Sequence, residues 1–364
     1  MNQYFNVWDH TLPEIYGIIL GMFNKLGLVD CLNITESELL DFIIDVDRGY
    51  LATFYHSFYH AADVTVMLYH MLAEMNASQF LSKPDMTAVL LAGLCHDIGH
   101  PGLNNLFQVN AKTELVKQFG EASVLERYSC SLAMDLVAKH KLMKESMIKA
   151  IMATDMSFHY NMLNNLNTLT EFISTPSSSV SNSDKLRQSF LNCLLHGADI
   201  SNPVKPWELC KRWSDLVMKE FYRQGDIEKA QNLPVSPNMD RDLHSQAQIS
   251  LGFVDFVVQP YFESLAELLP ESSPFLESLA YNHERWKLQK LEQDLEKERL
   301  QSADGAAATA AAAEVILNTT TDAVDALGQK VTGTGGIQRA GSPLPLHIIA
   351  VRRVSGMACN PGSC

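Results

Sequence analysis

The stretch TAVLLAGLCHDIGHPGLNN, residues 87–105, decides the fold and contains the first residues that indicate a functional site. Its apolar run up to Ile98 has no polar face, which predicts a helix in the middle of the core. Gly99 and Pro101 then end that helix. The pair His96-Asp97 therefore lies at the end of a buried helix. An imidazole and a carboxylate are costly to bury there unless they pair or bind a metal ion.

Outward from this stretch, apolar residues recur at spacings of three and four from Phe5 to about Leu300. The stripe within residues 64–75 is one example, and the alternation typical of strands is nearly absent. Thr35 and Glu38, which precede an apolar run, have the spacing of a capping box. We therefore predict an all-α, multi-helix fold.

The composition divides the chain into two parts. Residues 1–300 predict one domain, whereas Ala, Gly, Thr and Ser dominate residues 301–364, which predicts a low-complexity, flexible tail. The polar segment LPVSPNMD at 233–240 interrupts two helical stretches, so we expect a mobile flap near a site.

The net charge and the cysteines limit which partners and which cellular location we expect for this protein. The net charge of −14 argues against a nucleic acid polymer as partner, because neutralising phosphates requires a basic face. The seven cysteines form no C-x-x-C pair, which favours reduced thiols and a cytoplasmic location. We see neither a signal peptide nor a transmembrane segment, and a homodimer is compatible with the sequence.

Histidines and aspartates recur in a pattern that suits a metal ion. His56 and His60 are four residues apart, so on a helix they would share a face, and Asp63 follows close by. The pair His96-Asp97 ends the buried helix. Asp199 follows another apolar helix. Each alone would more often be a core histidine or a helix cap. Together they predict a site for zinc or another divalent transition metal, with an oxygen-rich side suited to magnesium or manganese.

Six segments, in order along the chain, resemble class I 3′,5′-cyclic-nucleotide phosphodiesterases, which are metal phosphohydrolases of the HD type. They are YHSFYHAADV (55–64), HDIGHPGLNN (96–105), SVLE (123–126), ATDM (153–156), ADISNPVKP (198–206) and GFVDFVVQPYFESLAELLP (252–270). The resemblance covers roughly residues 5–290. It implies a compact multi-helix phosphodiesterase or HD-domain fold with a deep metal-containing pocket.

The resemblance implies roles for particular residues, which we take as expectations. The zinc ligands would be His60, His96, Asp97 and Asp199, with Asp97 bridging to a second divalent metal, Mg²⁺ or Mn²⁺. Residues holding the waters of that second metal would be His100, Glu126 and Thr154. Hydroxide activated by the two metals would attack phosphorus, and His56 would be the general acid. A charged histidine needs a carboxylate partner, and we expect Glu284 in that role.

The base of the nucleotide would lie between Phe253 and an opposite wall of Val217 and Phe221, with Asn202 facing the base or ribose. The family's glutamine would stand at Ser250, and a short hydroxyl cannot make the two-point contact of an amide with a purine edge. We therefore expect weaker binding, relaxed discrimination between adenine and guanine, and a high Michaelis constant. Gly99 also replaces an acidic residue of the family, which removes one carboxylate around the metals.

The sequence thus predicts an enzyme that hydrolyses 3′,5′-cyclic AMP, cyclic GMP or both to 5′-nucleoside monophosphates. Two alternatives stay open. One is an HD-type phosphohydrolase acting on another nucleotide or phosphoester. The other is a catalytically weak cyclic-nucleotide-binding or scaffold protein, which the changes at Ser250 and Gly99 would favour.

Overall fold

The computed structural model describes residues 3–142, 145–173 and 183–301, and every regular element within these ranges is helical. The predicted all-α fold is confirmed. The α-helices are α1 (Leu12–Lys25), α2 (Val29–Leu32), α3 (Glu36–Gly49), α4 (Phe58–Ala73), α5 (Lys83–Cys95), α6 (Asn105–Asn110), α7 (Glu114–Phe119), α8 (Val124–Lys139), α9 (Glu145–Met152), α10 (His159–Ile173), α11 (Asp184–Asp199), α12 (Trp207–Ala230), α13 (Gln246–Phe253), α14 (Gln259–Leu268) and α15 (Ser273–Gln301). A short π-helix, Val254–Val258, joins α13 to α14.

The described residues up to Gln301 form one compact unit. The predicted tail, residues 301–364, lies outside the described residues except for Gln301, so the domain boundary stays a prediction. No helix in the described part of the chain combines the length and the apolar character that a membrane span requires.

Helices α4, α5 and α11 pack against one another in the core. Every residue of α5 from Asp85 to Cys95 is buried, as its apolar sequence predicts. A capping box between Ser82 and Asp85 begins this helix, and the predicted box between Thr35 and Glu38 begins α3 in the same way. Burial on all sides leaves α5 no solvent face, so any polar side chain at its end must find a partner inside the protein.

The ends of these three core helices meet at one place. Helices α4 and α5 pack together, and the start of α4 lies beside the end of α5, because His60 Nε2 is 3.3 Å from His96 Nε2. The end of α11 reaches the same point, because Asp199 contacts His60 near the start of α4. The start of α4 and the ends of α5 and α11 thus bring residues from distant parts of the chain together.

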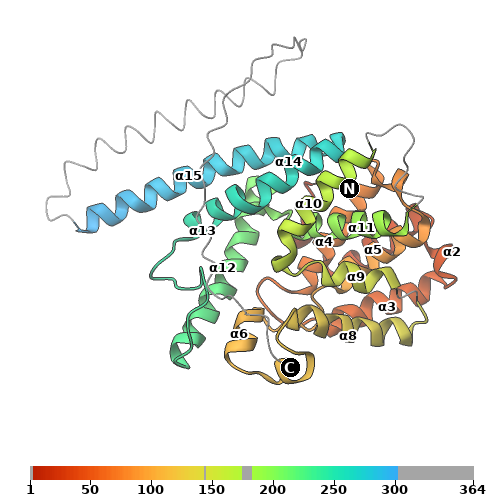
Figure 1. The fold of residues 1–364 in the computed structure, drawn as a ribbon, viewed down its shortest axis with the longest axis horizontal. Coiled ribbons are helices and arrows are strands. Elements are labelled where there is room, and N and C mark those ends of the chain that lie inside the picture. Colours follow the sequence, from red (N-terminus) through yellow and green to blue (C-terminus); the bar gives the residue numbers. More distant parts are fainter. Residues whose placement is uncertain (1–2, 143–144, 174–182, 302–364) are drawn as a thin grey trace, which may run out of the picture. The chain divides into compact units, whose positions relative to one another are not determined.

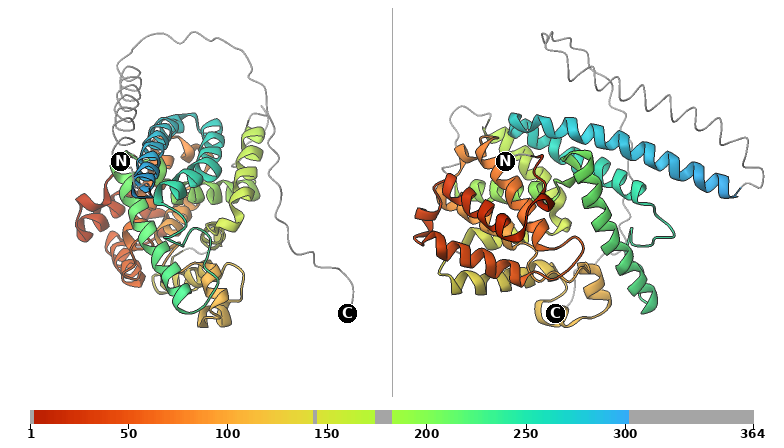
Figure 2. Two further views of the ribbon diagram at one scale, coloured as in Figure 1. Left: turned by 90° about the vertical axis from the view of Figure 1, so that its left-hand side faces the viewer. Right: turned by 180° about the vertical axis from the view of Figure 1, so that it is seen from behind.

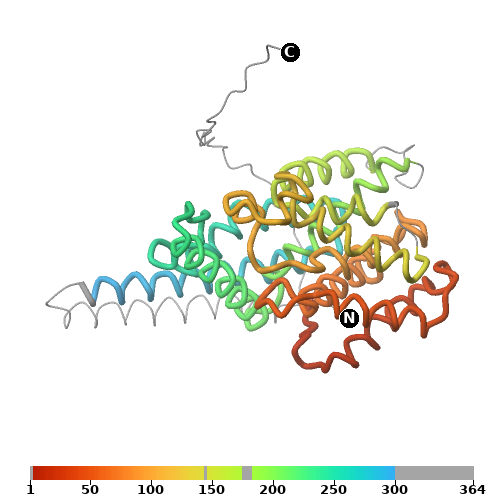
Figure 3. Tube along the Cα trace, turned by 90° about the horizontal axis from the view of Figure 1, so that it is seen from below, coloured from red at the N-terminus to blue at the C-terminus, as the bar shows by residue number. Residues whose placement is uncertain are grey.

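The C-terminal helices α12–α15 form a second group beside the core helices (Figures 1 and 3). Helix α12 and the long helix α15 are seen from two further directions in Figure 2, and contacts link α12, α13 and α15 to one another. The short segment Asn202–Val204, which follows Asp199, packs against both α12 and α15. The region between the two groups therefore contains both the end of α11 and the inner face of α12.

The segment 233–240 that we predicted to be a mobile flap is attached to α12. The backbone amide of buried Ser236 donates to Glu228, 2.7 Å away, and its hydroxyl donates to the same carboxylate. Asn238 lines the pocket described below, so the expected position near a site is correct.

Candidate functional site

Four predicted metal ligands converge where the core helices meet. The Nε2 atoms of His60 and His96 are 3.3 Å apart, and the Asp199 carboxylate lies 3.0 Å from His60 Nε2 and 3.4 Å from His96 Nε2. Asp97 completes the group, with Oδ2 3.1 Å from His96 Nε2 and 3.7 Å from His60 Nε2. One ligand atom from each residue lies within 4.8 Å of all the others. These residues are separated by up to 139 positions in the sequence.

The spacing of these atoms fits a divalent cation. Zinc bonds to imidazole nitrogen and carboxylate oxygen of about 2.0–2.2 Å place neighbouring ligands of a tetrahedron about 3.3–3.6 Å apart. The distances of 3.0–3.7 Å within the group agree with that geometry. The ring of His96 is also oriented for metal binding through Nε2, because its Nδ1 lies 2.9 Å from the Gly93 carbonyl oxygen. Donation from Nδ1 to that oxygen leaves the Nε2 lone pair free for a metal.

Within the group, carboxylates and imidazoles shift one another's pKa values. Burial alone would lower the pKa of His96, but Asp97 and Asp199 raise it well above its ordinary value. Burial alone would raise the pKa of Asp199, but the two imidazoles lower it. Two carboxylates therefore hold a proton on a buried histidine, and a divalent cation can take the place of that proton. These residues suggest divalent metal binding.

Asp63 is not part of the group. Its carboxylate accepts from Lys205 Nζ at 2.9 Å, and both side chains are buried. This ion pair ties the turn after Asp199 to α4. Asn282 of α15 donates to the carbonyl oxygen of Lys205 as well, at 2.7 Å. The ion pair and the Asn282 hydrogen bond thus hold the segment that follows Asp199 against α4 and α15.

The carboxylate partner of His56 is Glu220 of α12, not Glu284. His56 Nδ1 lies 2.6 Å from Glu220 Oε2, and the backbone amides of Tyr55 and His56 donate to Glu220 Oε1. Glu284 is half exposed on α15 and accepts from Lys287 at 2.8 Å. The prediction for Glu284 was wrong, because its side chain lies on the outer face of α15.

The His56–Glu220 pair favours the charged form of both groups. Burial alone would lower the pKa of His56, but Glu220 raises it to about 9. Burial alone would raise the pKa of Glu220, but His56 and the Tyr55 amide lower it to about 2. One signal could have found Glu220: with Gln224 and Glu228 it recurs every four residues on the buried face of α12, where an acid is unusual.

His100 is buried and Glu126 is half-buried near the same groups. The rings of His100 and His56 are stacked with centroids 3.8 Å apart, and burial lowers the pKa of His100 to about 3. The Glu126 carboxylate accepts from Asn105 Nδ2 at 3.0 Å, and burial raises its pKa to about 7. Thr154, also buried, donates its hydroxyl to Ile151. Their expected roles around a second metal stay predictions.

Gly99 is held in a conformation that suits glycine. Its φ is +78°, and an added Cβ would lie 2.5 Å from Leu132 Cδ1 and 2.8 Å from Tyr128 Cε1. An acidic side chain here would collide with these two side chains of α8 unless they moved, and it would also be strained by the positive φ. Side chains of α8 thus fill the space that a side chain at position 99 would need.

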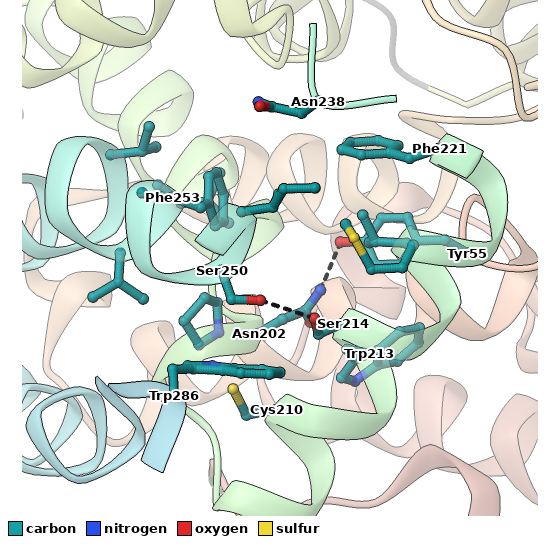
Figure 4. A pocket seen from close by; sticks show the side chains of 18 of the residues that line it. Tyr55, Asn202, Cys210, Trp213, Ser214, Phe221, Asn238, Ser250, Phe253 and Trp286 are labelled. Carbon is teal, nitrogen blue, oxygen red and sulfur yellow. Dashed lines mark hydrogen bonds between the residues drawn. The ribbon is translucent and has the colours of Figure 1, made fainter. Parts of the chain in front are cut away.

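A pocket of about 610 Å³ opens beside these groups, and His56 and Asp199 form part of its lining. All five residues predicted to contact substrate line it: Asn202, Val217, Phe221, Ser250 and Phe253. Phe253 and Phe221 lie on opposite sides of it in Figure 4. Asn202 Nδ2 donates to the Tyr55 hydroxyl at 2.6 Å, and the hydroxyls of Ser250 and Ser214 are 3.1 Å apart. The volume is typical of small-molecule sites.

Comparisons with known proteins agree with this geometry. The family described as 3′5′-cyclic nucleotide phosphodiesterase matches residues 55–279. The 3′,5′-cyclic-nucleotide phosphodiesterase regA of Dictyostelium discoideum is 35% identical over 78% of this chain and 37% of its own length. The high affinity cGMP-specific 3′,5′-cyclic phosphodiesterase 9A of Mus musculus is 32% identical over 73% of this chain and 51% of its own length. The chain thus spans about half or less of the length of these relatives.

A solved structure is similar along most of the described unit. The phosphodiesterase domain of Salpingoeca rosetta rhodopsin phosphodiesterase aligns with a TM-score of 0.76 at 28% identity, over 82% of this chain and 94% of that domain.

Proposed function

Because this chain belongs to the 3′5′-cyclic nucleotide phosphodiesterase family, we propose that it hydrolyses 3′,5′-cyclic AMP, cyclic GMP or both to 5′-nucleoside monophosphates. One observation supports this most directly. Two imidazoles and two carboxylates converge at the wall of a pocket that also contains the half-buried His56, paired with the buried Glu220. Cleavage of a phosphoester requires an activated water and a proton for the leaving oxygen. A bound cation can supply the first and a charged histidine the second.

We assign the binding of a divalent cation to His60, His96, Asp97 and Asp199. The mixed nitrogen and oxygen ligands suit zinc, and the acidic side formed by Asp97 and Glu126 suits Mg²⁺ or Mn²⁺. When bound, such cations would lower the pKa of a nearby water and neutralise negative charge on the phosphoryl oxygens.

His56 would supply the proton for the leaving ribose 3′-oxygen. Its Nδ1 is held by Glu220, so Nε2 is the nitrogen available to the substrate. The raised pKa keeps this imidazole charged at neutral pH. The stacked ring of His100 would limit rotation of His56, so the proton would be presented in one direction.

Phe253 and Phe221 would hold the base by stacking and apolar contact. Asn202, already bound to Tyr55, would offer its amide oxygen to the base or ribose. Whether the protein works in the cytoplasm and whether it dimerises stay predictions from the sequence. The five free cysteines of the described part are consistent with a reducing compartment.

The test is an assay on cyclic AMP and cyclic GMP after chelation, with zinc and magnesium added back. Asp199→Asn should lower kcat/KM by more than about 100-fold. Losing a residue that only hydrogen-bonds to a metal ligand costs up to about 100-fold, and losing a ligand itself should cost more. Asp41→Asn, an exposed aspartate of α3, is the matched control and should leave turnover unchanged.

Turnover that persists in Asp199→Asn, or without any divalent cation, would refute the assignment. A generic ester such as p-nitrophenyl phosphate tests the other HD-type reading. Cleavage of that ester in preference to both cyclic nucleotides would overturn the proposed substrate class.

A further inference from the structure

Tyr50, the residue that follows α3, places its hydroxyl group at the end of α5. The hydroxyl donates to the Leu94 carbonyl oxygen at 2.9 Å and accepts from the Asp97 backbone amide at 3.3 Å. In a helix that continued, the Leu94 carbonyl would accept from the amide of Ile98, four residues further on. Ile98 donates to the Cys95 carbonyl at 3.2 Å instead, so the Tyr50 hydroxyl takes a place in the backbone hydrogen bonding at the end of α5.

The course of the backbone at this point decides whether two neighbouring ligands can converge. Consecutive side chains of a regular helix point about 100° apart. Asp97 Oδ2 nevertheless lies only 3.1 Å from His96 Nε2. Residues 96–99 form a turn that leaves the helix. The position of the Asp97 amide within that turn therefore determines where its carboxylate points.

The surroundings of Tyr50 hold its side chain in place. The residue is buried, and its ring makes an edge contact with Phe58, the first residue of α4, with centroids 6.0 Å apart. The end of α3 also lies close to the turn, since an added Cβ on Gly49 would be 2.5 Å from Ile98 Cδ1. Burial and the Asp97 carboxylate raise the pKa of Tyr50 well above its ordinary value. The hydroxyl therefore keeps its proton and can donate and accept at once.

We propose that Tyr50 is a positioning residue for the cation site: its hydroxyl holds the backbone of Asp97, so that the carboxylate stays directed at the ligand atoms of His60 and His96. This inference rests on the proposed assignment of a divalent cation to these ligands. Among the described residues, those that line the pocket do not include Tyr50, so it acts through Asp97 and not on the substrate.

The experiment compares the unaltered protein with Tyr50→Phe, which removes only the hydroxyl. Each metal-free protein competes with a coloured chelator for zinc, which gives the dissociation constant. Tyr50→Phe should bind zinc about 10- to 100-fold more weakly, the usual effect of removing a group that orients a metal ligand. Cobalt bound in place of zinc absorbs visible light according to the arrangement of its ligands, so its spectrum should change in this variant.

Tyr222→Phe is the matched control, because it removes a hydroxyl that also donates to a backbone carbonyl at 2.9 Å, that of His244. It should leave the zinc affinity and the cobalt spectrum unchanged. The Tm of each metal-free protein is measured beside them. A Tyr50→Phe variant that melts earlier but keeps the zinc affinity and the cobalt spectrum would have lost stability alone, which would overturn the inference.

Hydrogen exchange on the unaltered protein tests the same contact without a substitution. In protein labelled with ¹⁵N-aspartate, NMR resolves the Asp97 amide, which should be protected because it donates to Tyr50. An Asp97 amide that exchanges as fast as in an unstructured peptide would also overturn the inference.

The outcomes separate this inference from the proposed function. If the unaltered protein binds no divalent cation, the cation assignment and the role of Tyr50 are both refuted. If it binds zinc and Tyr50→Phe binds zinc equally well, only the role of Tyr50 fails. If Tyr50→Phe weakens zinc binding but the unaltered protein hydrolyses neither cyclic nucleotide, the proposed activity fails and the role of Tyr50 stands.

Discussion

At the scale of single residues, the His56–Glu220 pair has a defined pH window. The pKa of His56 is raised from 6.5 to about 9, so its contribution to stability is fully present below pH 6.5 and is lost as pH rises through about 9. The pKa of Glu220 is lowered from 4.5 to about 2, so its contribution is present above pH 4.5 and is lost as pH falls through about 2. Both groups are therefore charged across the physiological range.

Glu220→Gln should remove the charge that keeps His56 protonated. We expect kcat to fall by about 10- to 100-fold at neutral pH, since general acid catalysis contributes at least that much. The alkaline limb of the pH–rate profile should move from near pH 9 toward the ordinary histidine value of 6.5. Glu284→Gln removes the half-exposed acid that pairs with Lys287 and should leave the profile unchanged. Equal profiles for the Glu220→Gln variant and the unaltered protein would contradict the pairing.

At the scale of elements, helix α12 forms hydrogen bonds to two loops beside the pocket, one at Asn104 and one at Ser236. Gln224 accepts from the Asn104 backbone amide at 2.8 Å and donates to Glu228 at 2.9 Å. Glu228 in turn holds Ser236, and Gly225 lies directly against the loop. The loop that follows His100 and the loop that carries Asn238 therefore share one polar network, which makes their positions interdependent.

Gly225→Ala should disturb this arrangement, because an added Cβ would lie 2.0 Å from the Met239 carbonyl oxygen. We expect the free energy of unfolding, measured in urea, to fall by about 1–3 kcal/mol. Gly17→Ala on α1 is the matched control: nothing lies within 4 Å of its added Cβ, and it should raise stability by up to about 1 kcal/mol. A gain in both variants would show that the loop does not pack on α12 as described.

At the scale of the whole molecule, the cation site joins α4, α5 and α11, which pack together in the core. Four ligands from three helices form a cross-link that exists only in the folded chain. A cation bound there stabilises the folded state by mass action, by about 4 kcal/mol at a thousand times its dissociation constant.

Chelation with EDTA should therefore lower Tm by about 5–15 °C, and added zinc should restore it. Asp199→Asn, which lacks one ligand, should show a smaller difference between the chelated and the metal-loaded protein. Differential scanning calorimetry with metal analysis of each sample measures both. A Tm that is the same with and without chelator in metal-loaded protein would rule out a cation in the core.

The sequence by itself determined the helical class, the buried character of α5 and the identity of four side chains that the fold brings together: His60, His96, Asp97 and Asp199. Periodicity and the cost of burying polar groups act locally, so they can be interpreted along the chain. Only the tertiary structure decided that Glu220 rather than Glu284 meets His56, 164 positions away. Periodicity identifies which face of a helix is buried, but the neighbour that this face meets depends on the packing of all helices together.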